Sequence, residues 1–143
     1  MDDMLSWGKQ VVASEPFNVL LGTELLGFSE HHAELKIPIR AELLQQQGFV
    51  HGGVMSYAAD SALAFAAGGA LGSSAVVTSE FKINYLRPAR GEFIVARASV
   101  IKGGTNQAVC RCDVYVFHEG DESLCATALG TVARLGRPPE ARK

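Results

Sequence analysis

The spacing of hydrophobic residues changes near residue 23, which predicts helical structure before that point and strands after it. Residues 5–12 are expected to form a short helix that packs through Leu5, Val11 and Val12. Residues 16–21 are expected to form a helical turn or a loop. Beyond them apolar and polar positions alternate, as in half-buried strands, first around Leu25 and Phe28 and then through Ala33, Leu35 and Ile37.

The second half of the chain shows the same alternation in four successive segments, residues 75–87, 92–101, 106–117 and 123–134. Short turn-like connections join them: Arg87-Pro88-Ala89-Arg90-Gly91, Lys102-Gly103-Gly104 and Glu119-Gly120-Asp121. A parallel crossover would need about a dozen residues or more. The segments are therefore predicted to pair with their neighbours in sequence, as an antiparallel four-strand meander.

One helix is predicted between the two groups of strands, from about Gly53 to Gly68, after a loop over residues 40–50. Its residues are mostly Ala and Gly, and the glycines from Gly68 to Gly72 provide a C-terminal cap. A helix with few large side chains lets a sheet approach it on all sides. We therefore predict an α+β fold in which an antiparallel sheet wraps around a wholly buried helix.

Residues 54–77 are apolar and long enough to suggest a membrane span. The stretch nevertheless contains Asp60 and several glycines, and an ionised carboxylate at the centre of a bilayer is costly. We therefore expect a core helix and no membrane partner.

The 143 residues are expected to form a single domain, with a core over about residues 15–135 and a loose C-terminal tail over residues 136–143. A net charge of -2, with scattered Lys and Arg residues, gives no electrostatic footprint for nucleic acid. The three cysteines lack the spacing of a zinc site, and no signal peptide is apparent. Buried thiols, no bound metal and a cytoplasmic location are expected.

Candidate chemistry is concentrated between Gln45 and Asp60, where a His-Gly-Gly turn opens the predicted helix. Gly52 and Gly53 allow a ligand to approach the backbone closely. The helix that follows offers free amide donors and a partial positive charge to a developing oxyanion. With Asp60 as the one carboxylate among apolar neighbours, this arrangement is typical of acyl transfer or ester hydrolysis.

The motif Gly48-Phe-Val-His-Gly-Gly-Val, with Asp60 eight residues after Gly52 and Asn84-Tyr-Leu-Arg-Pro-Ala further on, carries a resemblance over about residues 15–135. The chain resembles the PaaI-like, 4-hydroxybenzoyl-CoA-thioesterase-like acyl-CoA thioesterases, which have the hotdog fold. The resemblance implies hydrolysis of an acyl-CoA without a cofactor.

By that resemblance, Asp60 is the catalytic carboxylate, which attacks the thioester or acts as a base on a water, and the N–H of Gly52 polarises the carbonyl. Gln45 stands where relatives hold the carbonyl or the water, and Thr78 where some relatives have a Ser that orients the water. Simpler roles stay open, namely a buried Asp60 that is only hydrogen-bonded and a Gln45 that is only solvated.

Substrate contacts are expected from the same turn, at His51 and Gly53, although His51 is also suited to fixing the turn by hydrogen bonds. An aryl or medium-chain acyl group is expected to contact some combination of Phe49, Met55, Tyr57, Leu63 and Phe81. Candidates for the CoA phosphates are four cations and one glycine turn: Arg87, Arg90, Lys102, Arg134, Gly103 and Gly104. The alternative is that these cations are ordinary surface charges.

Asp60 lies seven residues past Gly53, which is roughly 10 Å along a helix axis. A base and an oxyanion donor must each lie about 3 Å from the reacting group. One chain can hardly supply both, whereas two antiparallel helices across a two-fold axis bring Gly52 of one chain to Asp60 of the other. The resemblance likewise implies a homodimer with shared sites, paired further into a homotetramer.

Two other functions stay open. A hotdog hydratase or dehydratase would need a His and an acid in motifs that this sequence lacks. A non-catalytic acyl-CoA-binding protein would have no use for a desolvated carboxylate. The leading hypothesis is a thioesterase acting on an aryl- or medium-chain acyl-CoA.

Overall fold

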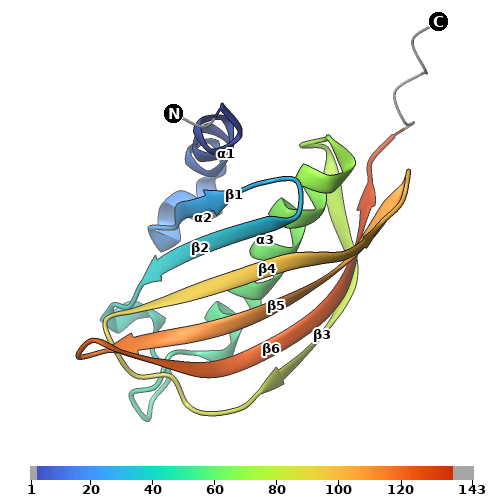
Figure 1. The fold of residues 1–143 in the computed structure, drawn as a ribbon. Coiled ribbons are helices and arrows are strands. Elements are labelled where there is room, and N and C mark those ends of the chain that lie inside the picture. Colours follow the sequence, from blue (N-terminus) through green and yellow to red (C-terminus); the bar gives the residue numbers. More distant parts are fainter. Residues whose placement is uncertain (1–2, 137–143) are drawn as a thin grey trace, which may run out of the picture.

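A curved antiparallel sheet wraps around one long helix in the computed structural model of the chain, which describes residues 3–136 (Figure 1). Apart from Gly136, the predicted C-terminal tail lies outside the described residues. The elements in chain order are α1 (Asp3–Ser14), α2 (Pro16–Leu21), β1 (Glu24–Phe28), β2 (His32–Pro38), the 3-10 helix η1 (Ala41–Leu43), α3 (Gly52–Leu71), β3 (Val76–Tyr85), β4 (Phe93–Gly103), β5 (Gln107–His118) and β6 (Asp121–Arg134). This is the α+β hotdog architecture that the resemblance implied.

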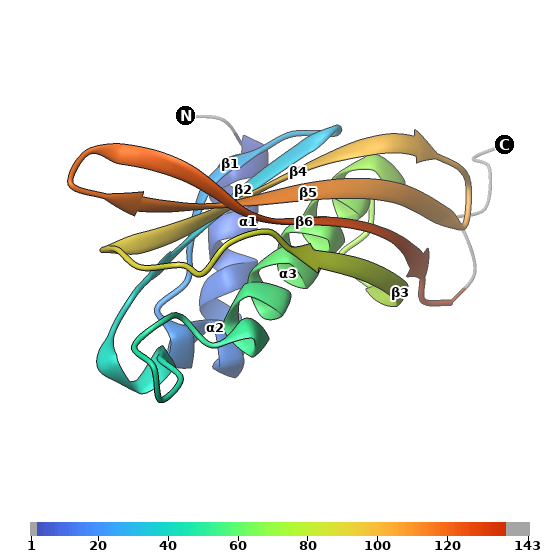
Figure 2. The same cartoon turned by 90° about the horizontal axis from the view of Figure 1, so that it is seen from below.

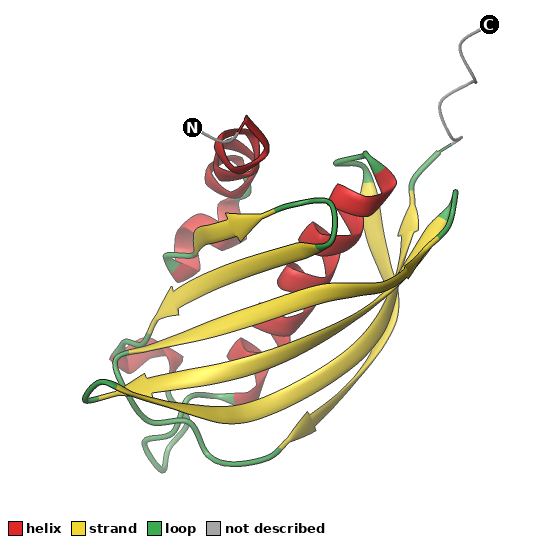
Figure 3. Cartoon of the chain, in the orientation of Figure 1, coloured by secondary structure: helices red, strands yellow, loops and turns green. Residues whose placement is uncertain are grey.

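The strands lie in the order β1-β2-β4-β5-β6-β3, and neighbouring strands are antiparallel (Figure 3). The predicted four-strand meander is wrong in one respect, because β3 pairs with β6 and not with β4. Residues 86–92 instead cross the ends of β5 and β6. Strands lie about 4.8 Å apart and an extended residue advances about 3.4 Å, so this segment is long enough for the crossing.

The helix α3 packs on the inner face of the sheet because its sequence is rich in alanine, a small residue with a strong helix propensity. One face of the helix is fully buried, through Ala58, Ala59, Ala62, Ala66 and Ala67. The helix ends at Gly72, whose φ of 64° is left-handed and whose N–H bonds the carbonyl of Gly68. The expected glycine cap is therefore present.

The opposite face of α3 is open, so the prediction of a wholly buried helix is wrong. Residues along this face keep partial or full exposure: Gly53, Ser56, Tyr57, Asp60, Ser61 and Ala64. Within residues 3–136, α3 is the one helix long and apolar enough to cross a membrane. It contacts all six strands, so it is the core helix of the fold.

The helix α1 lies against the edge strand β1 because Gly8 permits a close approach. A Cβ atom at Gly8 would lie 2.5 Å from a side-chain carbon of Leu25 and 2.7 Å from one of Phe28. Val12 is buried and Leu5 and Val11 pack at the margin of the core, as predicted. Figure 2 shows α1, α2 and α3 on the same side of the sheet.

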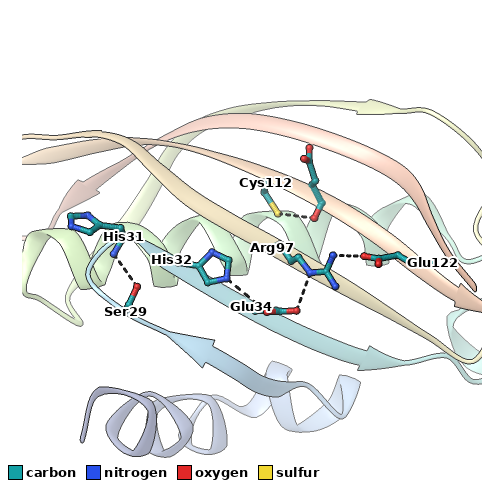
Figure 4. A network of polar contacts seen from close by, with 8 residues as sticks. Ser29, His31, His32, Glu34, Arg97, Cys112 and Glu122 are labelled. Atoms are coloured by element: carbon teal, nitrogen blue, oxygen red, sulfur yellow. Dashed lines mark hydrogen bonds and ion pairs between the residues drawn. The ribbon is translucent and has the colours of Figure 1, made fainter. Parts of the chain in front are cut away.

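The outer face of the sheet carries a network of charged side chains. Arg97 on β4 donates from Nε to Glu34 Oε1 at 3.0 Å and from Nη1 to Glu122 (Figure 4). Its guanidinium also stacks 4.6 Å from the centre of the Tyr115 ring. Arg97 alternates with the buried Ala96 and Ala98, which face the core. This face is therefore a solvated surface opposite the core helix.

All three cysteines are buried and free, as predicted. Loss of solvent raises the pKa of Cys110 and of Cys125 to about 11. Burial, followed by the nearby carboxylate of Asp113, also raises the pKa of Cys112. The thiols are therefore neutral at ordinary pH and unsuited to act as nucleophiles.

Candidate active site

The start of α3 is fixed by its N-cap residue, His51. The Nδ1 atom of His51 accepts a hydrogen bond from the N–H of Gly53 at 2.8 Å, and the His51 N–H donates to the carbonyl of Leu43 at 2.9 Å. This is the turn-fixing contact that the sequence suggested for His51. The cap does not use the N–H of Gly52, and this N–H donates to no group within residues 3–136.

Gly52 has room for a small side chain within its own chain. A Cβ atom added there would lie 3.4 Å from the ring of Tyr85, an ordinary contact. The Tyr85 hydroxyl donates to the carbonyl of Gly52 at 3.1 Å and shares a 2.6 Å hydrogen bond with Ser56 Oγ. The fold itself therefore does not demand glycine at position 52, and Gly52 lines a groove that a ligand atom could enter.

A groove of about 440 Å³ lies beside Gly52. Its lining residues come from the loop before α3, the first turn of α3, the end of β3 and the segment after β3: Gln45, Gln47, Phe49, Val50, Gly52, Met55, Tyr85, Leu86, Arg87, Pro88 and Ala89. Of the predicted CoA contacts, only Arg87 lines this groove.

The loop that carries Gln45 is held by its own side chains. The Oε1 atom of Gln45 accepts from the N–H of Gln47, which directs the side-chain carboxamide back to the loop. Arg90 lies 4.2 Å above the ring of Phe49 and donates to the carbonyl of Gln47 at 3.1 Å. Phe49 and Arg90, both expected at the substrate, thus contact each other, and Arg90 stabilises the loop.

Asp60 lines a different groove, of about 400 Å³, between α2, α3 and β3. The half-buried carboxylate accepts a 2.5 Å hydrogen bond at Oδ1 from the hydroxyl of Thr78 on β3. Within the described chain its other oxygen makes no hydrogen bond. The remaining lining residues are Glu15, Phe17, Asn18, Gly53, Ser56, Tyr57, Ser61 and Phe81.

Tyr57 is positioned in this groove by a chain of hydrogen bonds. Its hydroxyl shares a 2.6 Å hydrogen bond with Thr23 and donates to Asn18 Oδ1, and Asn18 donates to Glu15 Oε2 at 2.7 Å. Burial raises the pKa of Tyr57, against the lowering effect of its hydroxyl partners. With the hydroxyl held, the ring is presented to the groove, where Phe17 packs edge-on at 4.9 Å.

The two grooves have no lining residue in common. Gly52 and Asp60 are eight residues apart in one helix, about 12 Å along its axis. The structure therefore brings Thr78 to Asp60, and Gln45 and Tyr85 to the Gly52 side. The Ser56–Tyr85 hydrogen bond connects the walls of the two grooves, but Gly52 and Asp60 themselves stay apart within one chain.

The predicted phosphate-binding turn lies elsewhere. A Cβ atom at Gly103 would lie 3.6 Å from Ala70, near the C-terminal end of α3. That end is about 27 Å from Gly52 along the helix. Lys102, Gly103 and Gly104 therefore belong to neither groove of the same chain.

Three features of the site were missed from the sequence. The hydroxyl of Tyr85, the Glu15–Asn18 pair and the edge contact of Phe17 all depend on which segments meet. Only Tyr85 had a signal, because it lies in the Asn84-Tyr-Leu-Arg-Pro-Ala motif and at a strand position on the same face as Phe81 and Ile83, which pack against the core. Within residues 3–136, no group of three or more His, Cys, Asp or Glu side chains could hold a metal ion.

Comparison with known proteins gives a consistent family. Residues 47–123 match the thioesterase superfamily. A crystal structure of a thioesterase family protein from Silicibacter pomeroyi is 36% identical, with a TM-score of 0.83 over 88% of this chain and 93% of that one. The phenylacetic acid degradation protein PaaI of Thermus thermophilus is 31% identical, with a TM-score of 0.72 over 85% of this chain and 100% of that one. The medium/long-chain acyl-CoA thioesterase YigI of Escherichia coli is 28% identical over 87% of this chain and 88% of its own.

Proposed function

Because the chain belongs to the thioesterase superfamily and is a thioester hydrolase, we propose that it cleaves aryl- or medium-chain acyl-CoA thioesters at sites shared by two copies. The observation that carries the proposal is the separation of two complementary half-sites on α3. An unused backbone donor, the Gly52 N–H, lies at one groove, and a held carboxylate, Asp60, lies at the other.

The Gly52 N–H supplies the electrophilic half of the reaction. It lies at the positive end of a 20-residue helix, where backbone donors and the helix dipole favour negative charge. A thioester oxygen placed there gains stabilisation as it becomes an oxyanion. The adjacent carboxamide of Gln45, whose amide nitrogen is not used by the loop hydrogen bond, provides a second donor to the carbonyl or the water.

Asp60 supplies the basic half. As a general base it takes a proton from a water whose oxygen adds to the thioester carbon. The tetrahedral oxyanion then collapses, the carbon–sulfur bond breaks, and the CoA thiolate leaves and is protonated. Direct attack by Asp60 would instead form an acyl anhydride, which water then cleaves. In both routes the Thr78 hydroxyl orients the carboxylate through the 2.5 Å hydrogen bond.

A second copy of the chain completes each site. Within the described residues β3 pairs only with β6, so its other edge is available to another strand. Val77 on that strand is 45% exposed, and Thr78 lies beside it. Antiparallel pairing of two β3 strands about a two-fold axis would bring the open faces of two α3 helices together, with Gly52 of one chain near Asp60 of the other. Further pairing into a homotetramer stays a prediction.

The test is a hydrolysis screen over acyl-CoAs of graded chain length, together with benzoyl-CoA, in which released CoA thiol is measured colorimetrically. The Asp60→Asn protein serves as the blank for each substrate. Hydrolysis of at least one acyl-CoA well above that blank is expected. Equal rates for the two proteins on every substrate would remove the assignment of both the substrate class and the catalytic carboxylate.

A further inference from the structure

The groove that holds Asp60 continues along α3 into a second, smaller groove beneath α1. The second groove has a volume of about 90 Å³ and shares Glu15 with the first. Ser61 lines the first groove and Ala64 the second, and residues three apart are neighbours on one face of a helix. A ligand that begins at Asp60 can therefore extend along α3 without leaving the surface.

The second groove is mostly apolar, and its aromatic residues pack against one another. Trp7 packs edge-on against Phe28 with ring centroids 6.0 Å apart, and Phe28 packs in the same way against Phe65 at 5.6 Å. Among its described lining residues only Glu15 is charged, and that exposed carboxylate is hydrogen-bonded to Asn18 at the junction of the grooves. Ser73 and Ser74 add two hydroxyls to the lining, and Ser73 Oγ already accepts a hydrogen bond from the N–H of Ala75 at 3.0 Å. With no cation among the described lining residues, the groove is better suited to an alkyl chain than to a phosphate.

The wall formed by α1 has a fixed position. The close contact of Gly8 with Leu25 and Phe28 holds α1 against β1. On the other side of the groove, Ala64 and Gly68 are the smallest residues that a helix can present. The space between α1 and α3 is thus defined by small residues on one side and by Trp7 on the other.

We propose that this second groove receives the alkyl tail of the acyl group and sets its preferred length at about eight to ten carbons. Gly68 lies eight residues beyond Asp60, about 12 Å along α3. An extended alkyl chain advances about 1.25 Å per bond, from a C–C length near 1.5 Å and an angle near 111°. The inference rests on the proposed function, since it assumes that the acyl carbonyl reacts at Asp60.

The experiment compares kcat/KM over acyl-CoAs with two to sixteen carbons, and over benzoyl-CoA, for three variants. Ala64→Leu fills the second groove, and Trp7→Ala opens its far end. Ala13→Leu adds the same leucine side chain at an exposed position of α1 that lines neither the Asp60 groove nor the second groove.

The wild-type optimum is expected at about eight to ten carbons. Each methylene excluded from an apolar site costs about fourfold, so Ala64→Leu should lower decanoyl-CoA activity roughly tenfold or more while butyryl-CoA activity is kept. Trp7→Ala should move the optimum to longer chains, and Ala13→Leu should change nothing.

Two results would overturn the inference. One is a chain-length profile that Ala64→Leu leaves unchanged while the variant folds, as judged by circular dichroism. The other is a preference for benzoyl-CoA with no gain along the alkyl series. Failure of the proposed function looks different, because then no acyl-CoA of any length, nor benzoyl-CoA, would be hydrolysed above the Asp60→Asn blank. If Ala64→Leu does not fold, the Trp7→Ala profile decides alone.

Discussion

At the scale of single residues, the carboxylate of Asp60 and the hydroxyl of Thr78 form one unit, joined by a 2.5 Å hydrogen bond. Asp60→Asn should lower kcat by about 10²–10⁴-fold, the usual contribution of a general base, with little change in KM. Thr78→Val removes a hydrogen bond to a charged group and should cost roughly tenfold to a hundredfold. Thr78→Ser is the matched control and should retain activity.

Steady-state kinetics on the best substrate, with circular dichroism of each variant, checks this prediction. An Asp60→Asn protein with more than about a third of the wild-type kcat would contradict a base contribution of about 10² or more. If Thr78→Ser loses as much as Thr78→Val, the hydroxyl is not what holds the carboxylate. A single turnover in ¹⁸O-water then tests direct attack, since label in Asp60 arises only when water cleaves the anhydride at the Asp60 carboxyl carbon.

The buried thiols give a prediction about pH. An exposed thiol in the unfolded chain ionises near pH 8.5, whereas burial holds the pKa of Cys110 and Cys125 at about 11. Between these values the unfolded state releases protons that the native state keeps, so the free energy of unfolding should fall as pH rises from about 8.5 to about 11. Urea titrations across this range measure the fall, and a triple Cys→Ala variant should show a weaker dependence. An equal dependence in both proteins would mean that the thiols are not its source.

The positions of residues within a sequence motif could be predicted, whereas contacts between segments far apart in the sequence could not. Gly52 and Asp60 follow from helix spacing and from the chemistry of a single carboxylate, and the structure places each at a groove. The stacking of Arg90 on Phe49 and the inward turn of Gln45 depend on the path of a loop. No periodicity in the sequence specifies such a path.

At the scale of elements, the start of α3 depends on a side-chain cap at His51. His51→Ala removes the acceptor for the Gly53 N–H and should lower the free energy of unfolding by about 1 kcal/mol, the usual effect of losing an N-cap. His51→Asn keeps an acceptor at this position and should lose much less. Urea denaturation at one fixed protein concentration measures both, because an oligomer's stability varies with concentration. If the two variants are equally destabilised, the imidazole contributes by packing and not as a cap.

The strands themselves could be predicted closely, but the position of β3 could not. Alternation identifies β3 as a strand through Phe81 and Ile83, and it says nothing about the partner of that strand. A short connection favours pairing with β4, yet residues 86–92 instead cross β6 and β5. At the start of this crossing the N–H groups of Leu86 and Arg87 bond the carbonyl of Cys125 on β6, and at its end the N–H of Glu92 bonds the carbonyl of Phe117 on β5. The resulting position at the sheet edge is what exposes Val77, and it places Thr78 beside Asp60.

At the scale of the whole molecule, the open face of α3 and the free edge of β3 both favour a site shared by two chains. A single chain carries Gly52 and Asp60, the two halves of the proposed chemistry, on one helix, about 12 Å apart and in separate grooves. Residues on that face, such as Gly53 and Asp60, would be expected to be covered if the helix served only as a core. A symmetric pair of chains uses both halves twice, so activity should require the dimer.

Mixing two inactive proteins tests this requirement directly. An Asp60→Asn chain and a Gly52→Val chain should each be inactive, the first without the base and the second with a branched side chain where the thioester oxygen must reach. After subunit exchange in mild denaturant, one site of every mixed dimer receives both defects and the other receives none. Activity should reappear at up to about one quarter of the wild-type value, because random pairing makes half of the dimers mixed and each has one good site of two.

Asp60→Asn exchanged with itself is the control and should stay inactive. If no activity returns although mass spectrometry shows mixed dimers, each site is built from one chain and the two grooves of α3 do not work together across the interface.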